Sequence, residues 1–176
     1  MTPVYKIGGE TDPAEWSGIV GDSVNGYCGP SSCNSTWNAL TYNEEADGYR
    51  LPTEAEWEWL ARGGENYTYA GSNTVGDVAW YTTNTKDTGT REVKTKQANG
   101  YGLYDMSGNV YEWCYDWYGT VRSSTADTGA SSSSDRVRRG GSWNRDDSRC
   151  AVSSRNFDYP YSHNINCGVR VVRSAN

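Results

Sequence analysis

The sequence predicts a single α+β domain, residues 1–176, that is rich in loops and has short strands and one or two short helices. Its 176 residues are enough to enclose one hydrophobic core. Twenty glycines, spread among Ser, Asn and Asp, interrupt the apolar stretches as turns do. Eight Trp and fourteen Tyr offset a hydrophobic fraction of only 35%, because each aromatic ring buries a large area.

The first third of the chain predicts one short helix and a long loop. Asp12-Pro13-Ala14-Glu15 supplies a capping side chain, a first-turn proline and an acid three residues on, so a helix of one or two turns is expected to residue 17. Residues 21–38 predict a surface loop. Within it, Cys28 and Cys33 form either a small disulfide loop or two free thiols. The cysteines number five, so at least one is unpaired within the chain.

The strongest helix signal lies at residues 54–62. Thr53-Glu54-Ala55-Glu56 is a capping box, and Gly63-Gly64 follows Arg62 as a stop signal. Trp57, Leu60 and Ala61 are spaced to share one apolar face of the helix.

Short strands and loops are predicted for the remainder. The segment before the helix, 49–51, is expected to be extended, and 66–104 alternates aromatic or β-branched pieces with Gly and Asn turns. Residues 110–115 predict a buried strand, and the Ser- and Thr-rich tract 123–134 predicts a loop. Strands are then expected at 136–143 and 168–173, on either side of a polar stretch.

Composition excludes several classes of function. A net charge of -6 and a pI of about 4.8 lack the basic footprint needed to bind nucleic acid. No apolar run is long enough to span a bilayer, and the N-terminus lacks the features of a signal peptide. The cellular location is therefore undetermined, and a cell-surface, virion or secreted location would require a signal outside this chain. A single histidine argues against a zinc site.

Three blocks resemble, in order, the signatures of the formylglycine-generating enzyme (sulfatase-modifying factor) family. They are YRLPTEAEWE with ARGG (49–64), GLYDMSGNV with EW (102–113), and RGGSW (139–143) with GVR (168–170). The resemblance covers about residues 2–173 and implies the family's C-type lectin fold. The family's usual first strand and helix have no counterpart here, which predicts a shorter version of the domain or one completed by another chain; the oligomeric state is open.

The same resemblance implies a member without catalytic activity. Enzymes of this family oxidise a substrate cysteine with oxygen and copper, using two cysteines five residues apart. Cys150 matches the second of these cysteines, but Arg145 stands at the first. We therefore expect no copper and interpret Cys150 as a small buried residue. The alternative, a formylglycine-generating-type oxidase, needs a second cysteine near Cys150.

The polar stretch 144–167 contains no Lys, Glu, Gln, Met or Trp. It resembles the C-terminal variable region of proteins diversified by diversity-generating retroelements, in which AAC and AAT codons are mutated at adenine. Such codons yield Asn, Tyr, Ser, Asp, Phe, His, Arg, Ile or Cys, but none of the five missing residues. The resemblance implies a variable protein that displays a diversified binding surface for a protein or cell-surface ligand. The alternatives are a carbohydrate-binding, lectin-like module and a polar loop without a binding role.

Ligand contacts are implied at the diversified positions, where aromatic anchors accompany adaptable polar side chains as in antibody paratopes. These positions are Arg145, Asp146, Asp147, Arg149, Ser154, Phe157, Asp158, Tyr159, Tyr161, Ser162, Asn164 and Asn166. The fixed scaffold is expected to comprise Trp143, Val152, Arg155, Pro160, Gly168 and Arg170.

A structural calcium site is predicted beside the strand at 110–115. Asp105, Asn109 and Glu112, with the backbone carbonyls of Gly108 and Val110, offer the oxygen ligands that calcium prefers. The family resemblance implies Asp105 and Glu112 as side-chain ligands. The alternative is a hydrogen-bonded acidic turn.

Overall fold

The computed structural model describes residues 2–6, 9, 11, 41–43, 45–86, 88–120, 133–160, 162 and 164–173. The chain divides into two compact units: a larger one, Leu51–Pro160 with Asn164–Arg170, and a smaller one, Met1–Arg50 with Tyr161–His163 and Val171–Asn176. The helix predicted at 12–17, Cys28, Cys33 and most of the 123–134 loop lie outside the described residues.

Short backbone pairings make up the described part of the smaller unit. Strand β1 (Tyr5–Lys6) is antiparallel to β2 (Thr41–Tyr42). Arg50 and Val172 form an antiparallel bridge with hydrogen bonds of 3.0 and 2.9 Å. Residue 50 therefore has the extended conformation predicted for 49–51.

Helix α2 (Glu54–Arg62) has the predicted bounds. The capping box is closed in both directions: Glu56 N donates to Thr53 Oγ1 at 3.2 Å, and Thr53 N donates to Glu56 Oε2 at 2.8 Å. Gly63 ends the helix in the left-handed conformation, with φ 60°. Side-chain to backbone hydrogen bonds thus specify the start of α2, and the left-handed conformation of Gly63 specifies its end.

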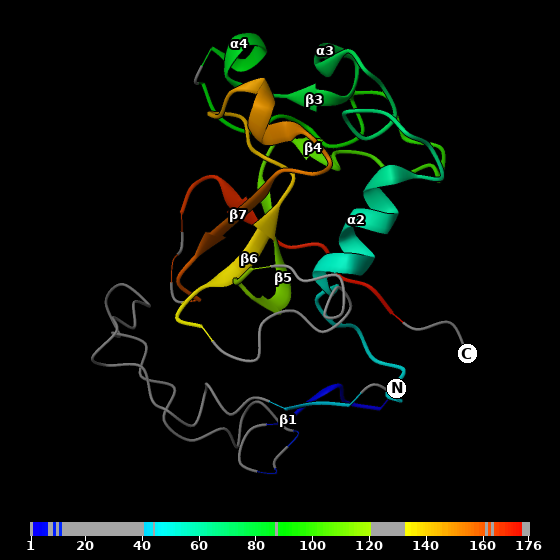
Figure 1. Ribbon diagram of the computed structural model, residues 1–176, viewed down its shortest axis with the longest axis vertical. Coiled ribbons are helices and arrows are strands. Elements are labelled where there is room, and N and C mark those ends of the chain that lie inside the picture. The colour runs from blue at the N-terminus through cyan, green and yellow to red at the C-terminus, as the bar shows by residue number, and fades with distance from the viewer. Residues whose placement is uncertain are drawn as a thin grey trace. The chain divides into compact units, whose positions relative to one another are not determined.

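A four-stranded sheet in the order β7-β6-β5-β8 lies beside α2 (Figure 1). Its strands are β5 (Tyr111–Trp117), β6 (Arg136–Arg139), β7 (Arg155–Asp158) and β8 (Cys167–Gly168). The β5–β6 and β6–β7 pairs are antiparallel, and the β5–β8 pair is parallel. Strand β6 is shorter than the predicted 136–143, because Gly140 and Gly141 turn the chain with φ of 92° and 75°.

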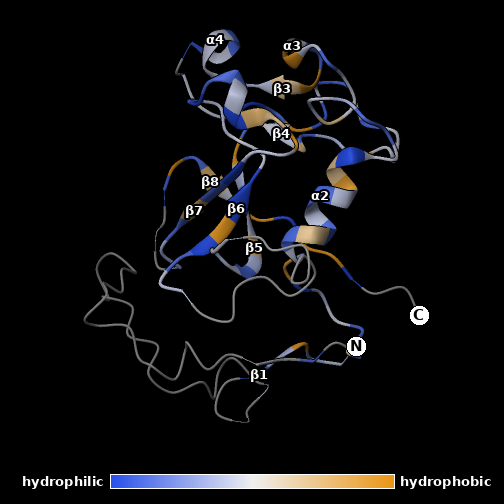
Figure 2. Ribbon diagram, viewed as in Figure 1, coloured by the Kyte–Doolittle hydropathy of each residue, from blue (hydrophilic) through white to orange (hydrophobic). Residues whose placement is uncertain are grey.

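Strand β7 lies inside the stretch that we predicted to be loop. Its four residues, Arg-Asn-Phe-Asp, include a single apolar side chain. They are extended because each pairs with a residue of β6. Figure 2 shows that β6 and β7 are mostly hydrophilic, so hydropathy alone does not reveal this part of the sheet.

Short elements surround a second, parallel strand pair, β3 (Ala79–Trp80) with β4 (Ser107–Gly108). Helices α3 (Val75–Val78) and α4 (Thr82–Thr85) lie beside it (Figure 1). The sequence predicted extended pieces and loops in this region, and both helices are single turns. A 3-10 helix, η2 (Asp147–Cys150), follows β6.

The core of the larger unit lies between α2 and the four-stranded sheet. Its buried cluster comprises Trp57, Ala61, Ala70, Met106, Cys114, Val137 and Val152. Trp57 is fully buried, and its indole N–H donates to Glu112 at 2.7 Å, so the aromatic ring satisfies its polar atom inside the core. Among the described residues, no helix is both long and apolar enough to cross a membrane.

Candidate ligand-binding face

Most of the predicted ligand-contacting residues are on the surface. The exposed ones are Arg145, Asp146, Asp147, Arg149, Phe157, Tyr159 and Asn164. Ser154, Asp158 and Ser162 are half-buried, and Tyr161 lies outside the described residues. The structure therefore makes a solvent-facing set of side chains available from the stretch 144–164.

Asn166 is the exception, and its assignment to the exposed surface needs correction. It is 4% exposed, and its side-chain amide donates to Asn144 Oδ1 at 3.0 Å. Its carbonyl oxygen accepts the backbone N–H of Tyr111 at 2.8 Å. Asn166 is therefore part of the frame that joins the start and the end of the stretch.

The turn between β6 and β7 presents Arg145, Asp147 and Arg149. Asp146 caps η2. Its Oδ1 accepts hydrogen bonds from Ser148 Oγ at 2.6 Å and from Arg149 N at 3.3 Å. The hydrogen bond from the Ser148 hydroxyl holds the pKa of the Asp146 carboxyl below its ordinary value. Cys150 lies fully buried at the end of η2. This short turn, which is hydrogen-bonded within itself, thus presents the exposed residues next to the buried Cys150.

The residues of β7 point to two faces of the sheet, because side chains alternate along a strand. Phe157 packs on Tyr118 with ring centroids 4.4 Å apart, and Arg155 also lies over the Tyr118 ring. Asn156 and Asp158 instead contact Arg138 of β6. Phe157 and Asp158, which we predicted to belong to one surface, therefore lie on opposite faces.

Arg138 and Tyr111 lie at the centre of the face that includes Asp158. Burial raises the pKa of the Tyr111 hydroxyl, and the positive charges of Arg138, Arg145 and Arg149 oppose that shift. Burial likewise raises the pKa of the Cys167 thiol, opposed by Arg138 and Arg145. The charges of Arg145 and Arg149 therefore act on the Tyr111 hydroxyl together with the charge of Arg138.

We call this surface the C-terminal face: Arg145, Arg149, Asn156, Asp158 and Asn164, arranged around Arg138. Asn164 joins it because its side-chain amide donates to Asp158 Oδ2 at 2.9 Å. Our sequence prediction omitted Asn156 and Cys167 from the contacting set and did not consider Arg138. Strand alternation from Asp158 would have pointed to Asn156 if β7 had been predicted as a strand.

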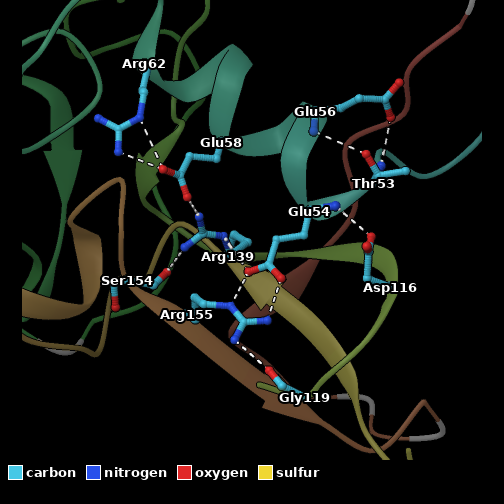
Figure 3. A network of polar contacts seen from close by, with 10 residues as sticks. All are labelled: Thr53, Glu54, Glu56, Glu58, Arg62, Asp116, Gly119, Arg139, Ser154 and Arg155. Carbon is cyan, nitrogen blue, oxygen red and sulfur yellow. Dashed lines mark hydrogen bonds and ion pairs between the residues drawn. The ribbon is translucent and has the colours of Figure 1, made fainter. Parts of the chain in front are cut away.

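A buried polar network holds the frame beneath this region (Figure 3). Arg155 donates to both carboxylate oxygens of Glu54 at 2.6 Å and to the carbonyl of Gly119 at 2.9 Å. Arg139, fully buried, donates to Glu58 and to the carbonyl of Ser154, and its Nε lies 3.3 Å from Glu54 Oε1. Helix α2 is thus tied to both β6 and β7 by charged groups.

Most of the predicted scaffold residues occupy such structural positions. Trp143 and Val152 are buried. Arg170 donates to both carboxylate oxygens of Glu112 at 2.8 Å, and a side chain on Gly168 would approach Val110 Cγ2 to 2.9 Å. Pro160 differs from the others because it is exposed.

The residues of the predicted calcium site have separate protein partners. Asp105 Oδ2 accepts Lys94 N at 2.8 Å, and Asn109 Oδ1 accepts Arg91 N at 3.0 Å, so both hold the loop at 91–94. Both carboxylate oxygens of Glu112 are occupied by Arg170, and one also accepts Trp57 Nε1. Glu112 in this arrangement does not fit a calcium ligand, which leaves Asp105 and Asn109 as the side-chain candidates of the predicted site.

Comparison with known proteins agrees with this architecture. Residues 12–175 match the family model described as the sulfatase-modifying factor enzyme 1-like domain. The chain belongs to that family. The resemblance drawn from the three sequence blocks and the predicted formylglycine-generating-enzyme-type fold are thereby confirmed.

Individual proteins similar to this chain give more detail. The structure of Treponema denticola variable protein 1 superposes with a TM-score of 0.81 at 38% identity, covering 96% of this chain and 61% of that one. The chaperone protein LppX of Paenibacillus barcinonensis is 38% identical over 99% of this chain and 62% of its own length. The formylglycine-generating enzyme of Streptomyces coelicolor is 37% identical over 80% of this chain and 51% of its own.

These likenesses confirm the predicted similarity to variable proteins. They also show that this chain spans about three-fifths of the length of the first two relatives and half of the third. The proteins similar to this chain include an enzyme and proteins with other names, so the names alone do not assign an activity to this chain.

Proposed function

We propose that this chain is a ligand-binding domain without catalytic activity, and that its C-terminal face recognises a protein or cell-surface ligand as a diversified surface. The observation that carries the proposal is the contrast within residues 143–170. Exposed side chains of mixed polarity there sit on a frame of buried residues and doubly hydrogen-bonded ion pairs. A rigid frame with exchangeable surface residues is the arrangement that antibody paratopes use.

The charges of the face favour a ligand that presents carboxylates. Asp158 pairs with Arg138, and Asp146 of the neighbouring turn caps η2, which leaves Asp147 as the exposed acid beside the face. Within the described residues, the guanidinium groups of Arg145 and Arg149 have no hydrogen bond or ion pair, and both are exposed. The whole chain carries a charge of -6, whereas the exposed charges of this turn, apart from the capping Asp146, are two guanidinium groups and the single carboxylate of Asp147.

Absence of catalysis is proposed from the state of the described thiols. Cys150 is fully buried, and burial raises its pKa to about 12, so the reactive thiolate is scarce at neutral pH. Cys114, Cys150 and Cys167 are all free thiols, and none of them is disulfide-bonded. The oxidase chemistry implied by the family resemblance requires a second redox-active thiol, and Arg145 stands at its position.

Population sequencing tests the binding proposal without knowledge of the ligand. Reads covering codons 143–170 and the flanks of the gene should show a template repeat carrying AAC or AAT at the codons for Arg145 and Tyr159. Amino-acid changes should concentrate at exposed positions and spare Trp143, Val152 and Arg155. Uniform codons throughout the stretch, with no repeat nearby, would refute the diversified surface.

A separate assay tests the proposed lack of catalysis. The protein is incubated with copper and a cysteine-containing peptide in air, and the peptide mass is followed over time. We expect no oxidation of the peptide cysteine to the aldehyde. The peptide mass should stay equally constant with Cys150→Ala. Turnover that disappears in Cys150→Ala would establish the oxidase instead.

A further inference from the structure

Arg138 lies in β6, outside the C-terminal stretch (residues 144–167). Its guanidinium nevertheless contacts three side chains of that stretch. Nε donates to Asn156 Oδ1 at 3.1 Å. Nη1 lies 2.8 Å from Asp158 Oδ2 and donates to Cys167 Sγ at 2.9 Å. The Arg138 side chain is 9% exposed, so these contacts lie beneath the surface.

The position of Arg138 is set by the two central strands of the sheet. It pairs with Trp113 of β5 on one side and with Asn156 of β7 on the other. Its guanidinium carbon lies 4.6 Å from the centre of the Tyr111 ring, whose hydroxyl accepts Asn156 Nδ2 at 3.3 Å. One arginine therefore reaches both outer strands, β7 and β8, from a fixed point between them.

A buried guanidinium restricts its neighbours. Arginine remains charged at every accessible pH, and a buried charge is costly unless hydrogen-bond acceptors surround it. Asn156, Asp158 and Cys167 are those acceptors here. Among the residues that a mutated AAC or AAT codon yields, Asn, Asp, Ser, Tyr and His accept hydrogen bonds, whereas Phe, Ile and Arg do not.

We propose that Arg138 is a positioning residue that orients Asn156, Asp158 and Cys167 and limits which side chains the C-terminal face tolerates at these positions. Its influence reaches the exposed surface through Asp158, which holds Asn164. Only the expected limit on sequence variants rests on the proposed function. The energetic coupling between Arg138 and the three side chains does not depend on it.

A double-mutant cycle measures that coupling. Asp158→Ile removes the carboxylate that pairs with the buried guanidinium of Arg138. We expect the folding equilibrium constant, measured by urea unfolding, to fall about a hundredfold. Arg138→Met removes the charge, so the same Asp158 change in that background should have an effect of about threefold or less. Asp147→Ile, at an exposed acid of the same stretch, serves as the matched control and should stay within about twofold.

The pH profile of Cys167 alkylation separates positioning from simple packing. Burial raises the pKa of the Cys167 thiol and Arg138 opposes that rise, so Arg138→Met should move the midpoint of iodoacetamide reaction to higher pH. The reaction is followed at Cys167 by peptide mass spectrometry. Arg138→Lys, which keeps the charge, should restore much of the shift. The proposal would be overturned if Asp158→Ile lowered stability equally in the wild type and in Arg138→Met, and if the midpoint of Cys167 alkylation did not move.

Sequenced variants distinguish this inference from the proposed function. If the stretch varies, residues without acceptors should not occur at 156 and 158 in the same clone, and frequent Phe or Ile at both would contradict the constraint. If the stretch proves invariant, the diversified surface is refuted, while the double-mutant cycle still decides the role of Arg138.

Discussion

Glu54 and Arg155 form a two-pronged ion pair that joins the first turn of α2 to the first residue of β7 across 101 positions of sequence. Both N···O distances are 2.6 Å, and the side chains are 12% and 24% exposed. The same carboxylate lies near Arg139, so Glu54 faces two guanidinium groups. The pair holds the start of β7, the longer of the two strands described in the C-terminal stretch.

Replacing Arg155 with methionine should therefore destabilise the protein. Removing Arg155 takes both 2.6 Å hydrogen bonds from a mostly buried carboxylate and leaves it the longer contact with Arg139, so we expect a loss of about 2–4 kcal/mol in the free energy of unfolding. Urea denaturation followed by Trp fluorescence measures it. Arg62→Gln, which breaks the exposed Arg62–Glu58 pair on the same helix, is the control and should cost less than about 1 kcal/mol. Equal losses in the two variants would contradict a structural role for Glu54–Arg155.

Gly141 is expected to tolerate no side chain. Its φ is 75°, and a Cβ atom there would lie 2.8 Å from both the carbonyl oxygen of Arg149 and Cys150 Sγ. Gly141→Ala should cost more than about 1 kcal/mol, because backbone strain adds to the contact with η2. Gly76→Ala, in open space within α3, should leave the melting temperature unchanged or higher. A harmless Gly141→Ala would show that η2 moves freely relative to β6.

Asp116 should make stability depend on pH. Burial raises the pKa of this carboxyl, although it accepts Glu54 N at 2.6 Å. A folded-state pKa above the unfolded one means that this contribution is greatest in acid and is lost as pH rises through the folded pKa. Asp116→Asn keeps an acceptor oxygen and removes the charge, so its unfolding free energy should exceed the wild-type value at pH 7.

The difference between Asp116→Asn and the wild type should shrink as pH falls towards 3.8, the ordinary value for this side chain. Urea unfolding at several pH values measures it, with the exposed Asp147→Asn as control. A difference that grew in acid would show that Asp116 is stabilised as a carboxylate instead.

Calcium is expected to leave stability unchanged, because Arg170 occupies both carboxylate oxygens of Glu112. Melting curves in millimolar calcium and in chelator should superimpose. A calcium-dependent rise in melting temperature that vanishes in Asp105→Asn and persists in Asp77→Asn would instead support the site predicted at Asp105.

The sequence by itself determined the features that short-range interactions specify. Helix α2 was predicted to the residue because its capping box and its terminal glycine act within a few positions. Most of the residues predicted to contact a ligand in the turn after β6 are exposed, because polar residues without periodicity seldom form a core.

Tertiary structure alone decided how those pieces combine into a face. Strand β7 exists because β6 pairs with it, and the resulting alternation separates Phe157 from Asp158. Asn166 is buried because Asn144, Ser142 and Tyr111 meet it from distant positions. Arg138 became recognisable as the centre of the face only when β7 and β8 brought their acceptors to it. Pairings between segments far apart in sequence leave no local pattern, and here they decide which side chains a ligand meets.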